Sequence, residues 1–160
     1  IYIEMKIKTI QAVNAYNVIK DLKVSNLNED DIISLWNNIK LLRPVSDEYT
    51  KSVEEAKKSL QNDEYNTMVQ RVRVAQDREN KVKEGTYTMT EDDIKDTKEI
   101  NDYFVDFNKK GTDYFKTLDD TEIDIDIKMI SDKELIKVIK GNDNVFDTLL
   151  KLDFMIEQSV

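Results

Sequence analysis

The chain has 160 residues, of which 36% are charged and 39% hydrophobic, with no histidine or cysteine and only three glycines and one proline. These counts exclude disulfides, His–Cys metal sites, an imidazole base, a thiol nucleophile and a glycine-rich phosphate loop. No apolar run approaches the about 18 residues that cross a bilayer, so no membrane partner is expected. Length and composition predict a single domain, residues 1–160, rich in solvated helices.

The net charge of −9 is unevenly distributed along the chain. Residues 1–85 contain 14 basic and 14 acidic side chains, whereas residues 86–160 contain 10 basic and 19 acidic ones. A negative balance opposes the phosphate contacts that dominate nucleic-acid affinity, so no nucleic-acid partner is expected. The acidic second half fits simple solubility, which is the plainer interpretation, or a basic protein partner.

Two segments alternate apolar and polar side chains with the period of a strand. The first covers residues 2–8, and the second covers residues 122–129, where isoleucines alternate with acidic residues. One strand is not stable alone, so the two are expected to pair as a small antiparallel sheet formed by the chain ends. Residues 86–89 are a candidate edge strand. The fold class predicted is helix-dominated α+β, with helices covering one face of the sheet.

Apolar side chains at helical spacing predict helices over most of the remaining chain. Thr9 is expected to cap the first helix and Asn28 to begin the second, with three acidic residues against its positive end. The stripe of the second helix contains Trp36, which we assign to the core, with an interface anchor as the alternative. Pro44 is expected to end this helix and to start the next one.

Residues 45–83 form the longest predicted helical segment. A polar interruption at residues 61–64 leaves open whether the segment is one helix or two. A continuous helix would measure roughly 58 Å at about 1.5 Å per residue. The segment is too long, and its apolar side chains too sparse, for it to be buried within one small subunit. We therefore expect it to protrude and to contribute to a homo-oligomer.

The later elements follow cap and turn signals. Thr90 is expected to cap a helix that Gly111 divides in two, and a turn is predicted at residues 119–121. Ser131 and Glu134 form a capping-box pattern that predicts the start of a short helix.

Three carboxylates of the predicted late strand, Glu122, Asp124 and Asp126, are the first candidate site. A strand places alternate side chains on one face about 7 Å apart, whereas a calcium loop brings its ligands together at a sharp glycine turn. No metal site is therefore expected. The favoured interpretation is a solvated, charge-protected strand, and the alternative is an acidic ladder presented to a basic partner.

A second candidate site contains three of the four arginines, Arg71, Arg73 and Arg78. The planar guanidinium group suits phosphate or carboxylate partners. Acidic residues are interleaved with these arginines along the chain, and they favour a salt-bridged helix face instead: Asp77, Glu79 and Glu84.

The sequence contains no recognisable set of catalytic residues. Serine and threonine have no histidine base, and the spacing of the carboxylates singles out no catalytic pair. We therefore predict a non-enzymatic protein without cofactors and without a small-molecule substrate. A hydrolase that uses carboxylates and a borrowed metal remains the third alternative.

The order of elements resembles an uncharacterised family of small proteins encoded mainly by tailed phages. The resemblance covers the two ends of the chain better than residues 61–118. It is carried by the segments Met5-Lys6-Ile7-Lys8, Leu22-Lys23, Asp47–Leu60 and Glu122-Ile123-Asp124-Ile125-Asp126-Ile127, and by Ser131, Leu135, Gly141, Leu149 and Leu152. It implies a phage accessory or virion-associated protein and supplies no catalytic residues.

The expected function is that of a phage-encoded interaction or assembly protein, with a protein partner or a second copy of itself. The alternative is a phage inhibitor that binds a host defence protein through the acidic second half. The expected location is the cytoplasm of a bacterial host or the virion. The chain does not begin with methionine, and Met5 is a candidate natural start.

Overall fold

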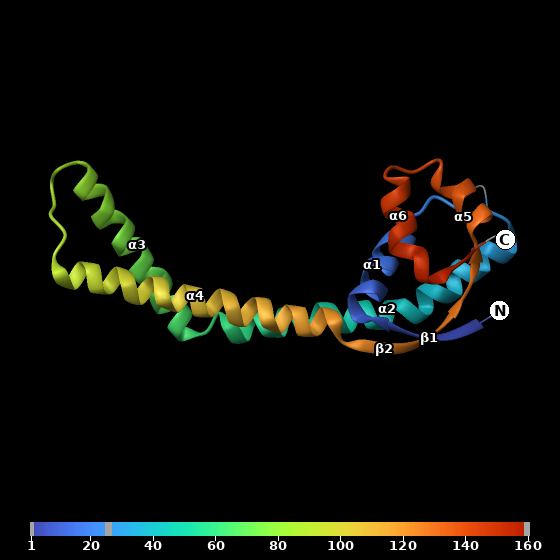
Figure 1. Cartoon of the computed structure of the whole chain (residues 1–160), viewed down its shortest axis with the longest axis horizontal. Helices are drawn as coiled ribbons and strands as arrows, with labels where there is room; N and C mark the ends of the chain where they lie inside the picture. The colour runs from blue at the N-terminus through green and yellow to red at the C-terminus, as the bar shows by residue number, and fades with distance from the viewer. Residues whose placement is uncertain (1, 25–26, 159–160) are drawn as a thin grey trace. The chain divides into compact units, whose positions relative to one another are not determined.

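The computed structural model describes residues 2–24 and 27–158, and it confirms a helix-dominated α+β fold. The elements, in chain order, are β1 (Tyr2–Lys8), α1 (Thr9–Ile19), α2 (Glu29–Leu60), α3 (Asp63–Lys83), α4 (Glu91–Asp120), β2 (Glu122–Lys128), β3 (Ile130–Ser131), α5 (Asp132–Ile139), α6 (Val145–Leu152), a 3₁₀ turn η1 (Asp153–Met155) and β4 (Ile156–Glu157) (Figure 1).

The chain divides into two compact units. The first unit contains residues 1–51 and 117–160, and the second contains residues 52–116. The boundaries fall inside α2 and α4, so both helices contribute to both units. The interpretation of residues 1–160 as one domain with a protruding segment stays a prediction.

The chain ends form the expected antiparallel sheet. β1 pairs with β2 in a register that runs from Tyr2 opposite Lys128 to Lys8 opposite Glu122. Ile125 and Ile127 are buried on the inner face of β2, as the alternation predicts. A second pair, β3 with β4, is parallel and only two residues long in each strand, which is too short for an alternating pattern to reveal.

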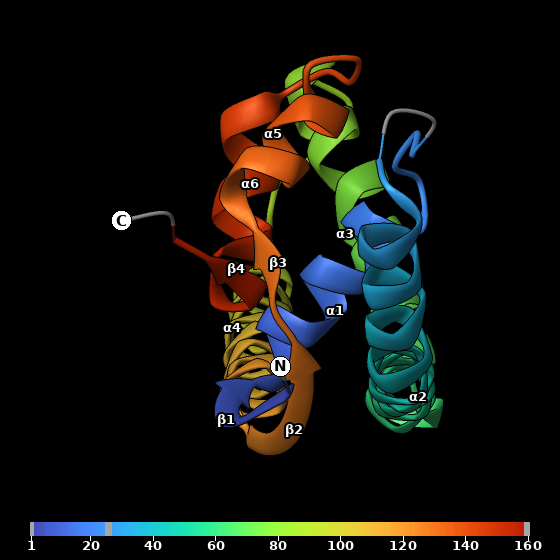
Figure 2. The same cartoon turned by 90° about the vertical axis from the view of Figure 1, so that its right-hand side faces the viewer.

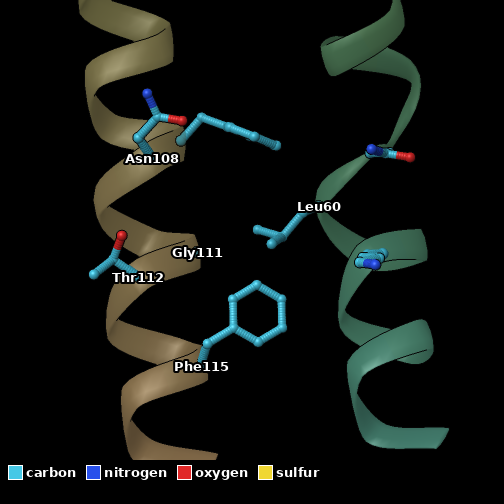
Figure 3. Close-up of a pocket in the computed structure, with 8 residues that line it drawn as sticks. Leu60, Asn108, Gly111, Thr112 and Phe115 are labelled. Atoms are coloured by element: carbon cyan, nitrogen blue, oxygen red, sulfur yellow. The ribbon is translucent and has the colours of Figure 1, made fainter. Parts of the chain in front are cut away.

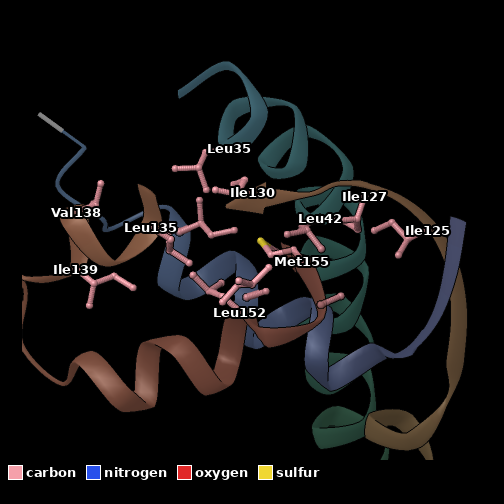
Figure 4. Close-up of a cluster of buried hydrophobic side chains, with 14 of the residues drawn as sticks. Leu35, Leu42, Ile125, Ile127, Ile130, Leu135, Val138, Ile139, Leu152 and Met155 are labelled. Atoms are coloured by element: carbon pink, nitrogen blue, oxygen red, sulfur yellow. The ribbon is translucent and has the colours of Figure 1, made fainter. Parts of the chain in front are cut away.

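The core of the first unit lies between α2 on one side and α6 on the other, as Figures 2 and 4 show. Both ends of the chain supply it, because helix α1 and strand β2 bring their apolar faces to the same cluster. The most deeply buried large side chains are Leu42, Ile127, Ile130, Leu135, Ile139, Leu152 and Met155.

The predicted helix boundary at Pro44 is wrong. Pro44 lies inside α2, which continues to Leu60. Leu42 is fully buried and Val45 packs against the same core, so tertiary packing holds the helix on both sides of the proline. Pro44 itself is exposed, so water can hydrogen-bond the carbonyl group that the proline leaves without an N–H donor.

The segment 45–83 is helical and consists of two helices rather than one. It comprises the last part of α2 and all of α3, with a break at residues 61–62. Asn62 caps α3 by accepting a hydrogen bond from the backbone N–H of Tyr65 at 3.0 Å. The side-chain amide of Asn62 thus satisfies a free N–H group at the start of α3 and marks the new helix.

Several local predictions about the later elements are corrected. Residues 86–89 form no strand, and Gly111 does not divide α4, which continues through the predicted turn as far as Asp120. Thr90 caps α4 as expected, since its Oγ accepts from the Asp93 N–H at 3.2 Å. Ser131 precedes α5 but makes no capping hydrogen bond with its side chain.

In the second unit, α3 runs antiparallel to the first part of α4. Tyr65 contacts Phe104 and Phe107, whereas Arg78, further along α3, contacts Asp93 near the start of α4. This hairpin buries little, because none of the residues 63–83 is buried. Its apolar contacts come from a half-buried stripe of α3 against the aromatic side chains of α4.

Candidate binding surface

The three strand carboxylates lie on the exposed outer face of β2. Glu122, Asp124 and Asp126 alternate with the inward isoleucines, as the sequence predicts. The same face carries lysines, because the register places Lys8 opposite Glu122 and Lys6 opposite Asp124.

Contacts with these lysines weaken the acidic character of the face. The Lys6 Nζ lies 3.9 Å from Asp124 Oδ1, and the Lys8 Nζ lies 3.2 Å from Asp120 Oδ1. The Lys128 Nζ lies over the Tyr2 ring. With Glu4 opposite Asp126, the outer face carries four carboxylates and three lysines, a small net charge that favours a solvated strand over a docking ladder. No group of carboxylates in residues 2–24 and 27–158 could hold a metal ion.

Two of the three arginines are engaged in the α3–α4 hairpin. Arg71 Nη2 pairs with Asp96 and with Glu99, the latter at 2.8 Å. Arg78 donates to Asp93 at 2.7 Å and to Asp96 at 3.2 Å, and its side chain is only 14% exposed. Both guanidinium groups are thus committed to holding the hairpin together.

Arg73 stands apart from this network. It is exposed and forms no ion pair within the described residues. Two of the three acidic residues interleaved with the arginines pair with lysines instead, since Asp77 contacts Lys81 and Glu79 contacts Lys83 one turn away. The expected salt-bridged face exists, but the carboxylates that bind the arginines come from α4.

Asp93 is the most strongly perturbed carboxyl group of this network. The Tyr87 hydroxyl donates to Asp93 Oδ2 at 2.6 Å, and the Thr90 N–H donates to the same oxygen at 2.9 Å. Together with the nearby Arg78 guanidinium, these donors lower the pKa of Asp93 to about 2. Hydrogen bonds to the charged form favour that form, which explains the direction.

The hairpin should therefore lose stability in acid. A lowered pKa in the folded state contributes stability that is present above the ordinary value of 3.8 and is lost as the pH falls through about 2. We expect Tyr87→Phe, which removes the first donor, to move the pKa of Asp93 back toward its ordinary value. An NMR titration of the Asp93 carboxyl carbon measures both values. An unchanged pKa in the variant would contradict this account of the network.

Trp36 is not in the core, which corrects its assignment from the sequence. Its side chain is 58% exposed, and the neighbouring Ile33 is 56% exposed. The buried side of α2 includes polar residues: Ser34, Asn38 and Ser46. Leu35 and Leu42 of the same apolar stripe are buried, so Trp36 lies at the solvent-facing edge of the stripe rather than at its buried centre.

Asn38 fixes the orientation of α2 against β2. Its side-chain amide donates to the Lys128 carbonyl oxygen at 2.8 Å and accepts from the Lys128 N–H at 2.9 Å. Both hydrogen-bonding groups of one β2 residue are thus satisfied by a helix side chain. The requirement that buried polar groups be paired outweighs the burial of the larger indole ring.

Trp36 borders an open groove between the end of α1 and the start of α2, which we call the Trp36 groove. Its volume is about 210 Å³. Lys20 lines it, and the Lys40 Nζ lies 5.9 Å from the centre of the Trp36 ring. The apolar residues that line the groove are Ile19, Leu22, Val24, Ile32, Leu35, Trp36 and Ile39. Such a lining can receive apolar side chains of a protein partner.

A second hollow, of about 300 Å³, lies in the second unit. Figure 3 shows Leu60 directed toward α4 at the level of Gly111 and Phe115. A Cβ atom at Gly111 would lie 3.8 Å from Leu60 Cδ1, an ordinary van der Waals distance, so the packing here does not require glycine. Lys57 is the one charged residue of the described chain in its lining, so the hollow offers no acid–base pair for catalysis.

Comparisons with protein-family models, curated proteins and solved structures find no match to this chain. In the described residues, no helix is both long and apolar enough to cross a membrane. The exposed tryptophan and its groove are the feature that sequence analysis assigned to the wrong environment.

Proposed function

We propose that the chain is a non-enzymatic interaction or assembly protein, of the kind that tailed phages encode, and that it binds its protein partner through the Trp36 groove. The observation that supports this proposal most directly is the exposure of Trp36 beside an apolar groove. Tryptophan is enriched at the energetic centres of protein interfaces. An exposed indole ring beside other apolar side chains is costly in water unless a partner covers it.

The alternative function is inhibition of a host defence protein through the acidic second half. The exposed carboxylates of Glu122, Asp124 and Asp126 favour it, although Lys6 and Lys8 share their surface. Both functions place the protein in the bacterial cytoplasm, and assembly also places it in the virion.

A capture experiment separates the two functions. Tagged wild-type protein, Trp36→Ala, Val105→Ala and a triple Glu122→Gln, Asp124→Asn, Asp126→Asn variant are each incubated with lysate of phage-infected bacteria, and the bound proteins are quantified by mass spectrometry. Val105 is the matched control, because it is 70% exposed on α4 and does not line the groove.

We expect Trp36→Ala to reduce recovery of the partner at least about 10-fold, the effect of losing an interface anchor, while Val105→Ala behaves like wild type. Loss with the triple variant alone would favour the alternative function instead. Equal recovery by all four proteins would contradict both.

A further inference from the structure

The first unit carries a second exposed apolar surface, on α5 and α6. Phe146 and Leu150 lie one turn apart on α6 and are 82% and 77% exposed. Ile136 of α5 is 37% exposed beside the same hollow. We call these three residues the α6 ridge. Two adjacent large apolar side chains this exposed are typical of an interaction surface.

The α6 ridge and the Trp36 groove differ in charge. Asp132 and Asp153 line the hollow at the ridge, and no lysine of the described chain does so. Lys140 follows Ile136 by one turn but does not line it. At the groove, Lys20 is in the lining, Lys40 covers the indole ring, and no carboxylate of the described chain lines it. The hollow at the ridge is lined by two carboxylates, whereas the groove has one lysine in its lining and a second over its tryptophan, so the two surfaces are complementary in charge.

The two surfaces belong to different helices of the first unit, since α1 and α2 border the groove and α5 and α6 carry the ridge. Helix α2, which carries Trp36, and helix α6 lie on either side of the buried cluster in Figures 2 and 4. The ridge of one copy therefore cannot reach its own groove. A second copy of the chain can present its ridge to this groove.

We propose that the α6 ridge of one copy docks into the Trp36 groove of a second copy, giving a head-to-tail contact. This inference rests on the proposed function, because it names the partner of the same groove. A head-to-tail contact leaves a free groove at one end and a free ridge at the other, so it extends into rings or filaments rather than stopping at a dimer. Each contact is small, so association is expected to be weak and concentration-dependent.

Two variants each add a charge that repels the opposing surface. Both charges are placed at exposed positions. Ile33→Asp adds a negative charge beside the groove, against the acidic ridge, and keeps Trp36 as a fluorophore. Leu150→Lys adds a positive charge on the ridge, against the lysine-lined groove. Both positions are more than half exposed, so both variants should fold, and circular dichroism checks this.

Sedimentation equilibrium from about 10 µM to about 1 mM, the range in which weak contacts are populated, measures the assembly. We expect the mass of the wild-type chain to rise beyond that of a dimer, from a monomer of 18.8 kDa. Each variant alone should stay monomeric. An equimolar mixture should form a dimer and nothing larger, because only the ridge of Ile33→Asp and the groove of Leu150→Lys remain intact.

Other outcomes overturn the proposal. A wild-type chain that stays monomeric throughout the range excludes the contact but leaves the capture of a different protein by the Trp36 groove intact, so the two proposals fail separately. A wild-type dimer that never grows, or variants that do not complement each other on mixing, indicates a symmetric contact between identical surfaces instead.

Discussion

Replacing Ile125 with aspartate is expected to lower the free energy of unfolding by about 3–5 kcal/mol, because it removes buried apolar surface and places a carboxylate in the core. Ile125 is 7% exposed and lies opposite Met5 in the sheet. Small domains are stable by only about 5–15 kcal/mol, so the loss is a large part of the total. Urea unfolding followed by Trp36 fluorescence reports on the first unit, which contains both residues.

The matched control is Asp126→Asn, the next residue along β2. Asp126 faces solvent and lies opposite Glu4, so the substitution removes one partner of a like-charge pair. We expect a change within about 0.5 kcal/mol, in the stabilising direction. Equal urea midpoints for Ile125→Asp and wild type would show that the inner face of β2 is not part of the core.

The strands could be predicted from the sequence because their signal is local. A period of two in Ile123, Ile125 and Ile127 assigns each side chain to one face, and the pairing of the chain ends follows from the scarcity of other strands. The register between β1 and β2, which places Ile125 opposite Met5, comes from the structure and was not predicted. Strands β3 and β4 could not be found in this way, because two residues carry no periodicity.

The exposure of Trp36 and the burial of Asn38 could not be predicted, because the contact that holds Asn38 inside involves a residue 90 positions away. By hydrophobic pattern, Trp36 belongs to the stripe and Asn38 to the surface. In the structure Trp36 is exposed and Asn38 is buried, because the Asn38 side chain hydrogen-bonds the N–H and carbonyl groups of Lys128. The candidate binding surface is thus a consequence of a buried polar contact that no local pattern reveals.

The sequence predicted that the arginines lie on a salt-bridged helix face, but it did not predict which carboxylates they bind. Charged residues near Arg71 and Arg78 along the chain indicated local neutralisation, which α3 does show between lysines and carboxylates. The hairpin brings Asp93 and Asp96 closer to the arginines than their sequence neighbours. Antiparallel packing of two helices is a tertiary feature, and the spacing within one helix does not encode it.

Replacing Asn38 with leucine is expected to lower the free energy of unfolding by about 2–4 kcal/mol, although leucine is apolar and the site is fully buried. The Lys128 N–H and carbonyl groups would each lose a hydrogen bond, and an unpaired buried polar group costs about 1–3 kcal/mol. Asn37→Leu is the matched control, since Asn37 makes only an exposed contact with the Tyr2 hydroxyl and should change stability by less than about 0.5 kcal/mol.

Asn38→Asp adds a dependence on pH that distinguishes lost hydrogen bonds from altered packing. The new carboxylate can accept from the Lys128 N–H but cannot donate to the Lys128 carbonyl oxygen, and burial raises its pKa above the ordinary value. A raised pKa gives stability that is complete at low pH and is lost as the pH rises. The deficit of Asn38→Asp relative to wild type should therefore shrink between pH 7 and about pH 4, whereas the deficit of Asn38→Leu should stay constant. If urea unfolding shows a constant deficit for both variants, the amide does not act through the Lys128 backbone.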